Sequence, residues 1–326
     1  MTRPAAPRLV AAGDLAGRLL RRCTLPAPGA PLTCAVSGGP DSLALLVLAS
    51  LGGCLVTAVH VDHGLREGSA EEADVVAAAA AALGAQFRAE RVSVGPGPNL
   101  EARARAARFA ALPSSVATGH TMDDQAETVL CNLLRGAGPD GVAGMRPGPR
   151  HPLLALRRAE TRAVCEEAHL EWVEDPSNHD PRHLRNRVRH ELLPLCAALA
   201  GRDPVPLLAR LASLAAADAD LLDALAAETV PDPTVAREVA RAPEPLAGRA
   251  IRRWVRALGA TPGSGGRPSA TEGLDRQPPP LADVRRVLSV AQGAASGTEL
   301  TGGWRVRRSA GRLVAIPPSG APGDGH

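Results

Sequence analysis

The stretch AVSGGPDSLALL, from Ala35 to Leu46, places two adjacent glycines, a proline and an aspartate flanked by serines between two apolar runs. The run before the glycines, 32–36, is short and apolar and predicts a buried strand. The run after them, 41–51, is rich in Leu and Ala and predicts a buried helix that ends near the pair Gly52-Gly53. The stretch is therefore a strand, a glycine turn and a helix.

This turn has the properties of a phosphate site. Backbone N–H groups at the start of a helix have no intrahelical partners, and the helix dipole adds partial positive charge there. Glycines let an oxyanion come close to the backbone. The Walker pattern would require a Lys before its final Ser or Thr, but the chain contains no Lys, and all 37 basic residues are Arg. The sequence SGGPDS therefore predicts a phosphate loop of another type, and the alternative is an ordinary turn between a strand and a helix.

Composition limits the classes of protein to which the chain can belong. With 326 residues, 45% of them hydrophobic and 22% charged, we expect a soluble globular protein of two domains. The net charge of +3 indicates no partner by itself, but arginines are clustered and favour a polyanion partner. Because only 2% of residues are aromatic, binding of nucleic acid would depend on Arg more than on ring stacking. The clusters are 182–194, Arg249/Arg252/Arg253/Arg256 and Arg305/Arg307/Arg308/Arg312.

The six cysteines are scattered and form no CxxC pair, so the sequence predicts neither a disulfide framework nor a zinc site. Cys34, Cys54 and Cys131 lie in apolar runs and are expected in the core. This cysteine usage fits a reducing cytosol. The N-terminus lacks the apolar run of a signal peptide, and no stretch could span a bilayer. We therefore expect a cytoplasmic protein without a membrane partner.

Further apolar runs alternate with helical patterns along the first half of the chain. This order predicts an α/β fold with a doubly wound parallel sheet, in which ligands bind outside the carboxyl ends of the strands. The predicted strands are 32–36, 54–61, 86–94 and 115–119, with a weaker run near 151–154, and the predicted helices are 41–51, 69–83, 99–111 and 122–134.

The second half predicts a smaller, mostly helical α+β domain. Ala/Leu-rich helices are expected over 186–258, a low-complexity loop over 259–280, and a helix over 281–291 followed by two β-like runs. We assign 1–195 to a catalytic domain, 196–316 to a helical linker and small substrate-binding domain, and 317–326 to a disordered tail.

Polar residues gather where the predicted strands end. The second strand runs into HVDHGLR (60–66), and the helical stretch NLEARARAARFA places Glu101, Arg105 and Arg108 on one face. An Arg on that face could reach phosphates, or the face could be solvated and hold i,i+4 ion pairs.

The third group of polar residues follows the run 115–119, in ATGHTMDDQAETVLCNLLRGAG. His120, Asp124 and Glu127 are spaced at i, i+4 and i+7, which predicts one shared face at a helix start. An imidazole and two carboxylates at a strand end could deprotonate an amine, or hold an ammonium ion and a metal-bound phosphate. The alternative is an N-capped helix with acidic first-turn residues, which explains His120 poorly.

Together these motifs resemble a known family. SGGPDS is similar to the PP-loop of ATP pyrophosphatases, and the ordered series SGGPDS, HVDHGLR, ExxARxxRF, GHTMDDQAETVLCNLLRGAG, PLL and DPSNHDPRHLRNRVRHELLP resembles the tRNA(Ile)-lysidine synthetases. The match is dense over 30–195 and looser beyond. Phe109 stands where a Tyr is usual, and Thr121 replaces a frequent second His and indicates that this position is dispensable. The resemblance leads us to expect a short form without the extra C-terminal domain of longer members.

The resemblance implies an adenine nucleotide α-hydrolase-like fold and a reaction in two steps. The wobble cytidine of the CAU-anticodon isoleucine tRNA is adenylated at its C2 oxygen by ATP with Mg²⁺, and pyrophosphate leaves. Free L-lysine then attacks C2 and AMP leaves, which gives lysidine and switches the tRNA from Met to Ile. The phosphates would be held by Arg105 and by the loop Ser37, Gly38, Gly39, Pro40, Asp41 and Ser42, with Val61 and Asp62 at the adenine.

The resemblance also implies roles for the remaining polar groups. Asp124 and Glu127 would bind and deprotonate the lysine ammonium, and His120 would lie near the α-phosphate. Arg185 and Arg189 would bind either nucleotide phosphate or the tRNA backbone.

Three other readings of the motifs remain open. A tRNA thiolase on the same scaffold is disfavoured because the chain has no CxxC, and a glutamine-dependent amidotransferase because no glutaminase domain is present. A non-enzymatic ATP-sensing module would leave the polar group at His120 without a role. The oligomeric state stays open, with a homodimer as one option, as does the division of contacts among Arg182, Arg185, Arg187 and Arg189.

Overall fold

The computed structural model describes residues 14–62, 69–92, 103, 107, 110–174, 176–258 and 279–318. Its contacts divide the chain into two compact units, Met1–Ala216 and Ala217–His326. The domain boundary at 195 that the sequence suggested stays a prediction. No helix in the described part of the chain is both long enough and apolar enough to cross a membrane.

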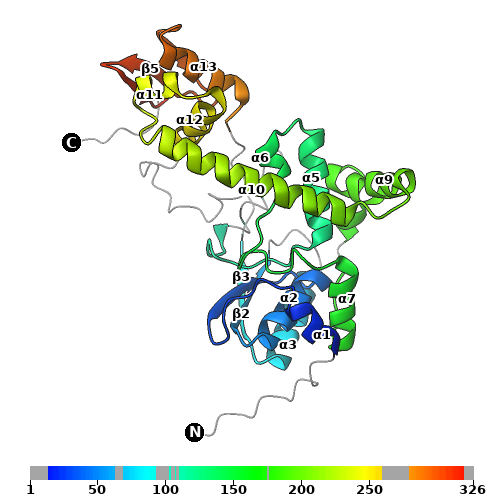
Figure 1. Cartoon of the computed structure of the whole chain (residues 1–326). Helices are drawn as coiled ribbons and strands as arrows, with labels where there is room; N and C mark the ends of the chain where they lie inside the picture. Colours follow the sequence, from blue (N-terminus) through cyan, green and yellow to red (C-terminus); the bar gives the residue numbers. More distant parts are fainter. Residues whose placement is uncertain are drawn as a thin grey trace, which may run out of the picture. The chain divides into compact units, whose positions relative to one another are not determined.

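The first unit is built on a parallel sheet of order β1-β2-β3, in which Cys34 pairs with Ala58 and Ala58 with Phe87. Helices alternate with the strands, and Figure 1 shows α2 and α3 beside the sheet and α7 beside α2. The predicted α/β class with a parallel sheet is confirmed. The elements are α1 (Asp14–Leu20), β1 (Pro31–Ala35), α2 (Pro40–Leu51), β2 (Leu55–Asp62), α3 (Ser69–Ala82) and β3 (Gln86–Arg91).

The predicted fourth strand, 115–119, is reduced to one parallel bridge between Ala117 and Cys34. Ala35 N–H donates to Ala117 O at 2.9 Å, and Ala117 N–H donates to Thr33 O at 2.8 Å. The pairing stops there because a turn precedes it, with Val116 N–H on Pro113 O at 3.0 Å, and Thr118 N–H turns to Arg150 O at 2.9 Å. The weaker run near 151–154 likewise forms turns, with one bridge between Gly148 and His151.

Helices complete the first unit. The segment Val188–Leu192 is a π-helical turn in which Leu193 N–H donates to Val188 O. Pro194 follows it and lacks the N–H that would continue an α-helical ladder, which explains the wider turn. The elements are α5 (Met122–Leu134), α6 (Pro139–Val142), α7 (Arg158–Glu167), a 3₁₀ turn (Pro176–His179), α8 (Leu184–Arg187), the π turn, α9 (Leu193–Ala200) and α10 (Val205–Thr229), which continues into the second unit.

The core of the first unit surrounds α2. Every residue from Leu43 to Ala49 is buried, which confirms the predicted buried helix. Cys34, Cys54 and Cys131 are buried as expected, and all six thiols are free. Because α2 is closely packed in the core, the glycine turn at its N-terminus is held in a fixed position.

The second unit packs helices on a small antiparallel sheet of order β4-β5-β6. Its core includes Ile251, Val287 and Leu313. The predicted helix near 281–291 and the two β-like runs are confirmed, whereas 259–278 and the tail from 319 lie outside the described residues. The elements are α11 (Ala236–Arg241), α12 (Glu244–Leu258), α13 (Leu281–Gln292), β4 (Gly297–Glu299), β5 (Arg305–Ser309) and β6 (Arg312–Ile316).

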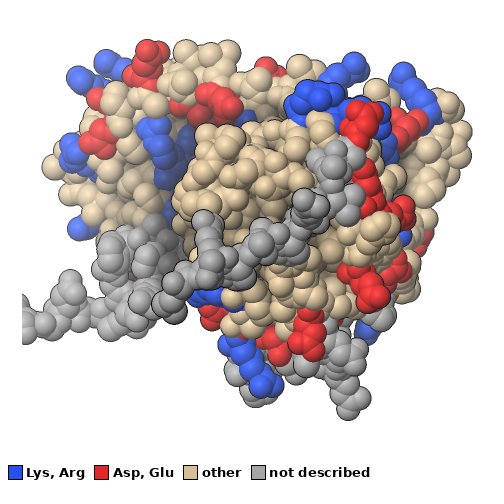
Figure 2. Space-filling view, turned by 90° about the horizontal axis from the view of Figure 1, so that it is seen from below, with Lys and Arg blue, Asp and Glu red and all other residues tan. Residues whose placement is uncertain are grey.

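On the face drawn in Figure 2, basic and acidic side chains are interspersed around a broad uncharged area.

Candidate active site

A cavity of about 630 Å³ opens where the connections of the sheet diverge. β2 pairs with one edge of β1 and Ala117 bridges to the other, so the loops after β1 and after Ala117 leave from neighbouring positions. Parallel sheets bind ligands at such a switch point, outside the carboxyl ends of the strands. Both loops line the cavity, whose volume suits a small-molecule ligand.

The phosphate loop, residues 37–42, is preorganised by its own contacts. Gly38 has φ of +84°, a conformation that favours glycine. Ser42 Oγ accepts from Ser37 N–H at 3.1 Å and donates to Gly39 O at 2.9 Å. No side chain caps the start of α2, so its first N–H groups remain available to an anion.

Gly119 brings the second loop against the first. A Cβ atom at Gly119 would lie 2.5 Å from Asp41 O and 2.9 Å from Ser42 N. The two backbones therefore touch, and only glycine allows this approach.

Asp41 projects from the phosphate loop toward α7. Its carboxylate accepts hydrogen bonds from Thr161 Oγ1 and, at 3.4 Å, from Arg158 Nε. Burial raises the pKa of Asp41 above its ordinary value, and the neighbouring Asp124 raises it further, while Thr161 and Arg158 oppose both effects. The folded environment therefore disfavours the charged form of the Asp41 carboxylate.

Helix α5 begins at Met122, and its N-cap Thr121, which directly follows His120, forms a capping box with Asp124. Asp124 Oδ2 accepts from Thr121 N–H at 2.9 Å and from Thr121 Oγ1 at 2.8 Å. His120 therefore precedes the helix, and the expectation of one helical face for His120, Asp124 and Glu127 was wrong for His120. Its imidazole nevertheless lines the same cavity as Asp124.

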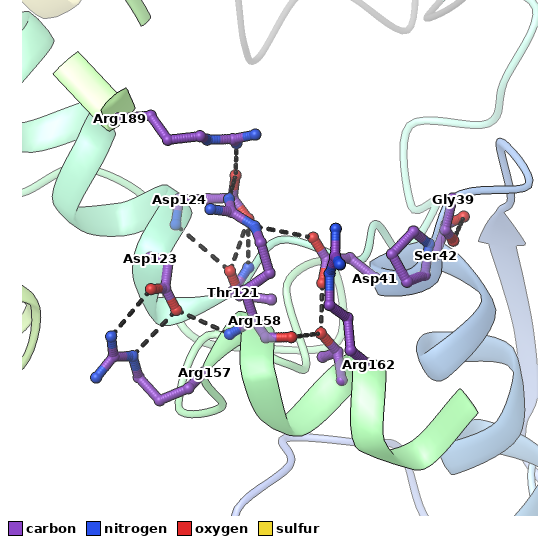
Figure 3. Close-up of polar contacts among 12 residues, drawn as sticks. Gly39, Asp41, Ser42, Thr121, Asp123, Asp124, Arg157, Arg158, Arg162 and Arg189 are labelled. Carbon is purple, nitrogen blue, oxygen red and sulfur yellow. Dashed lines mark hydrogen bonds and ion pairs between the residues drawn. The ribbon is translucent and has the colours of Figure 1, made fainter. Parts of the chain in front are cut away.

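Three arginines, the guanidinium triad of Arg158, Arg185 and Arg189, hold the carboxylate pair of Asp124 and Glu127. Glu127, whose side chain is fully buried, accepts from Arg158 Nη1 at 3.1 Å, Arg185 Nε at 2.8 Å and Arg189 Nε at 2.6 Å. Asp124 Oδ1 accepts from Arg158 Nη2 at 3.0 Å and from Arg185 Nη2 at 2.9 Å. Figure 3 shows Arg158 extending between Asp41 and Asp124, with Arg189 approaching from the opposite side.

The electrostatics follow from this pairing. Burial alone would raise the pKa of Asp124, but Arg158 and Arg185 lower it below its ordinary value. Burial would lower the pKa of Arg158, and the surrounding carboxylates raise it instead. Three carboxylates, with Asp41 counted, thus face three guanidiniums, and the cluster carries no net charge.

Sequence reasoning missed Arg158 and its neighbour Arg157. Arg157 forms two hydrogen bonds of 3.1 Å with Asp123, and Arg158 N–H donates to Asp123 Oδ2 at 2.8 Å. Two cations at the N-terminus of α7 oppose the helix dipole and need acidic partners. The Arg157-Arg158 pair followed by Glu160 was the available signal, because Glu160 Oε2 accepts from Arg157 N–H at 2.7 Å at the start of α7.

Most of the predicted site residues meet in the cavity. Two predicted residues are close to the cavity but do not line it: the buried Glu127, which is bonded to the guanidinium triad, and Gly38, which is part of the phosphate loop. Asp62 ends β2, with its carboxylate 3.9 Å from Arg91 Nε, and does not line the cavity. Arg105 and the segment 63–66 lie outside the described residues. The predicted residues that line the cavity are Ser37, Gly39, Pro40, Asp41, Ser42, Val61, His120, Asp124, Arg185 and Arg189.

Comparison with known proteins agrees with this geometry. A family model for the PP-loop domain matches residues 18–196. A tRNA(Ile)-lysidine synthase of Salinispora tropica is 42% identical over 324 residues, covering 90% of this chain and 92% of the relative. One of Mycolicibacterium paratuberculosis is 46% identical, covering 70% and 75%, and one of Salinispora arenicola is 39% identical, covering 92% and 95%. From the PP-loop and these matches over nearly the whole chain, we conclude that the protein belongs to the tRNA(Ile)-lysidine synthase family.

Proposed function

We propose that this chain uses ATP to join free lysine to C2 of the wobble cytidine of the CAU-anticodon isoleucine tRNA, which gives lysidine. The observation that carries the proposal is one cavity in which Arg158 links the phosphate loop to a buried carboxylate pair. Arg158 thus contacts both the loop proposed to bind phosphate and the carboxylates proposed to bind the ammonium. Relatives named tRNA(Ile)-lysidine synthase support the assignment of the substrates.

In the first step, the C2 oxygen of cytidine attacks the α-phosphorus of ATP, and the bond to pyrophosphate breaks. The phosphate loop and the start of α2 stabilise the charge that develops on the phosphate oxygens. Val61, at the end of β2, lines the cavity and would contact the adenine. Arg105 remains a proposed phosphate ligand, by family resemblance.

Magnesium fits this site through Asp41. Among the described residues, no group of three or more His, Cys, Asp or Glu side chains is arranged to hold a metal. Mg²⁺ needs fewer protein ligands, because it is commonly bound by one or two carboxylates together with phosphate oxygens and water. Asp41 is part of the phosphate loop and lines the cavity, and burial disfavours its charged form in the ligand-free protein. When bound, the ion would neutralise charge on the phosphates.

In the second step, the lysine Nε attacks C2, and the bond from C2 to the oxygen of AMP breaks. The free ammonium has a pKa of ~10.4, so little nucleophile exists at neutral pH without a base. Asp124 and Glu127 are the carboxylates that would hold the ammonium and accept its proton. His120 would stabilise charge at the α-phosphate.

Lysine can reach the carboxylate pair only if a guanidinium moves. Both carboxylates already accept several charge-assisted hydrogen bonds, and the cluster is neutral. Phosphates of ATP or tRNA would attract members of the triad, most readily Arg185 and Arg189, whose side chains are 37% and 23% exposed. We propose that phosphate binding draws one of them away and so opens the carboxylate pair to lysine.

The reaction itself tests the function. The protein is incubated with ATP, lysine and CAU-anticodon tRNA, and pyrophosphate, AMP and RNA-bound labelled lysine are measured. We expect tRNA-dependent pyrophosphate release without lysine, and AMP release with incorporation of lysine when it is added. Asp41→Ala and Ser42→Ala should abolish adenylation and leave the fold intact. ATP turnover that does not depend on tRNA, or RNA without lysine, would contradict the proposal.

A further inference from the structure

Three polar groups surround the hydroxyl of Thr118, immediately before Gly119. Thr118 Oγ1 lies 2.7 Å from His120 Nδ1, 2.9 Å from His151 Nδ1 and 3.2 Å from Arg150 O. Thr118 and His151 are buried, and the two imidazoles meet edge to face with centroids 5.2 Å apart. Neither Thr118 nor His151 has a role in the two steps above.

The proton count at this hydroxyl limits how the rings can be protonated. A threonine hydroxyl donates one hydrogen bond and accepts two. Arg150 O only accepts, so when the hydroxyl donates to it, both Nδ1 atoms must carry protons. When the hydroxyl instead donates to His120 Nδ1, His120 carries its proton on Nε2. The hydroxyl can thus partner either form of His120 by rotating.

Of the two histidines, His151 is the one that keeps a single charge state near neutral pH. Burial, with a contribution from Arg150, lowers the pKa of His151 to about 4, so its ring is neutral near pH 7. A neutral ring carries one N–H, and Nδ1–H donating to Thr118 Oγ1 satisfies both partners in either rotation of the hydroxyl. In that tautomer His151 donates to Thr118 Oγ1, and the hydroxyl donates to His120 Nδ1 or to Arg150 O.

We infer that Thr118 and His151 form a positioning pair that holds His120 by Nδ1 and so fixes the orientation of its imidazole toward the ligand in the cavity. The inference rests on the proposed catalytic role of His120. The hydroxyl keeps its hydrogen bond whether His120 donates or accepts at Nδ1. His120 can then keep its orientation at the α-phosphate whichever ring nitrogen carries the proton.

The first test is the rate of adenylation. Thr118→Val keeps the shape and removes the hydroxyl, and we expect kcat to fall about tenfold, less than the loss of a group that itself stabilises transition-state charge. The KM for ATP should stay within about twofold. Thr118→Ser restores the hydroxyl and should restore kcat to within about threefold of the parent, a rescue that a purely packing role would not require.

The second test does not depend on activity. Nitrogen-15 labelling of the nine histidines reports which ring nitrogen carries the proton, and His120→Asn and His151→Asn assign the two signals. In Thr118→Val the protonation pattern of His120 should change, and in His151→Phe it should shift as well. If both signals match the parent and kcat is unchanged in Thr118→Val, the positioning pair is overturned. If the parent adenylates no tRNA while the signals change as expected, the proposed function fails and the pair stands.

Discussion

At the scale of single residues, Gly119 decides how closely the two loops of the site approach. We expect Gly119→Ala to weaken ATP binding by about tenfold, or about 1.4 kcal/mol, because the new methyl group would overlap the Asp41 carbonyl. The free energy of unfolding should fall by about 1–3 kcal/mol, as in other overpacked sites. Calorimetric titration with ATP and urea denaturation measure both quantities. Gly17→Ala in α1 is the control, because a Cβ there meets no atom within 4 Å, and equal effects of the two variants would refute the argument.

Glu127 carries a buried charge on which three arginines depend. In Glu127→Gln we expect lysidine formation to fall more than pyrophosphate release, because the ammonium loses its charge partner, and adenylated tRNA should accumulate. Stability should also fall by about 1–3 kcal/mol, since a buried charged network loses one partner. Glu191→Gln is the control, because its pair with Arg187 is exposed and is worth less than about 1 kcal/mol. A proportional loss of both steps would show that Glu127 is not specific to lysine.

Asp41 and Asp124 should affect stability in opposite directions. The pKa of Asp124 is lowered in the folded chain, so its charge stabilises the fold above the unfolded pKa of ~3.9, and this stabilisation is lost as the pH falls below that value. The pKa of Asp41 is raised, so its charge costs stability at neutral pH, and the cost disappears as the pH falls through the raised pKa.

At pH 7 we therefore expect Asp124→Asn to lower the free energy of unfolding by about 3 kcal/mol, because it removes a partner from buried ion pairs. Asp41→Asn should raise the stability of the ligand-free protein while it blocks adenylation, the usual trade-off at an active site. Urea denaturation at pH 7 and at lower pH measures both, and the two differences from the parent should shrink as the medium becomes acidic. A destabilised Asp41→Asn at pH 7 would contradict the reading of Asp41.

At the scale of elements, α8 and its π turn carry two arginines that reach one carboxylate. Arg185 and Arg189 are four residues apart, and both contact Glu127. Between them, Arg187 points elsewhere and pairs with the exposed Glu191. The segment therefore contains its own matched control.

We expect Arg189→Gln to bind free lysine several-fold more tightly than the parent when ATP and tRNA are absent, because Glu127 loses a competing guanidinium. If Arg189 also meets the tRNA backbone, the variant should bind tRNA more weakly, and the slope of log affinity against log salt should decrease by about one. Arg187→Gln should change neither lysine binding nor the slope. Equilibrium dialysis with labelled lysine and filter binding of tRNA across salt concentrations provide the measurements.

Two other outcomes would be informative. If Arg189→Gln weakens ATP binding and leaves the salt slope unchanged, Arg189 serves the nucleotide. If lysine binding, ATP binding and the slope all match the parent, the proposed exchange between guanidinium and ammonium is wrong.

At the scale of the whole molecule, every residue that lines the cavity belongs to the first unit. We expect ATP with Mg²⁺ to slow hydrogen exchange in 37–42 and 118–120 and to leave α13 of the second unit unchanged. Mass spectrometry of peptides from the full chain measures this. Equal protection of α13 would indicate that nucleotide binding is coupled to the second unit.

The sequence by itself determined the local parts of this protein. The run before SGGPDS, the glycines and the apolar run after it specified a strand, a turn and a buried helix, and the structure has all three within one residue of the predicted bounds. It also identified ten of the residues that line the cavity. These features can be predicted from the sequence because the periodicity of apolar residues, the conformation of glycine and the residues at a helix start all depend on neighbours along the chain.

Only the tertiary structure decided which charges meet. Arg158, Arg185 and Arg189 converge on Glu127 from positions 31, 58 and 62 residues away, and no local pattern encodes such distances. The same holds for Ala117, whose pairing ends because Arg150 O takes the N–H of Thr118. A buried carboxylate requires compensating cations, and tertiary packing determines which cations these are. In this chain they are three arginines, which occupy the carboxylate pair that the sequence had suggested for lysine.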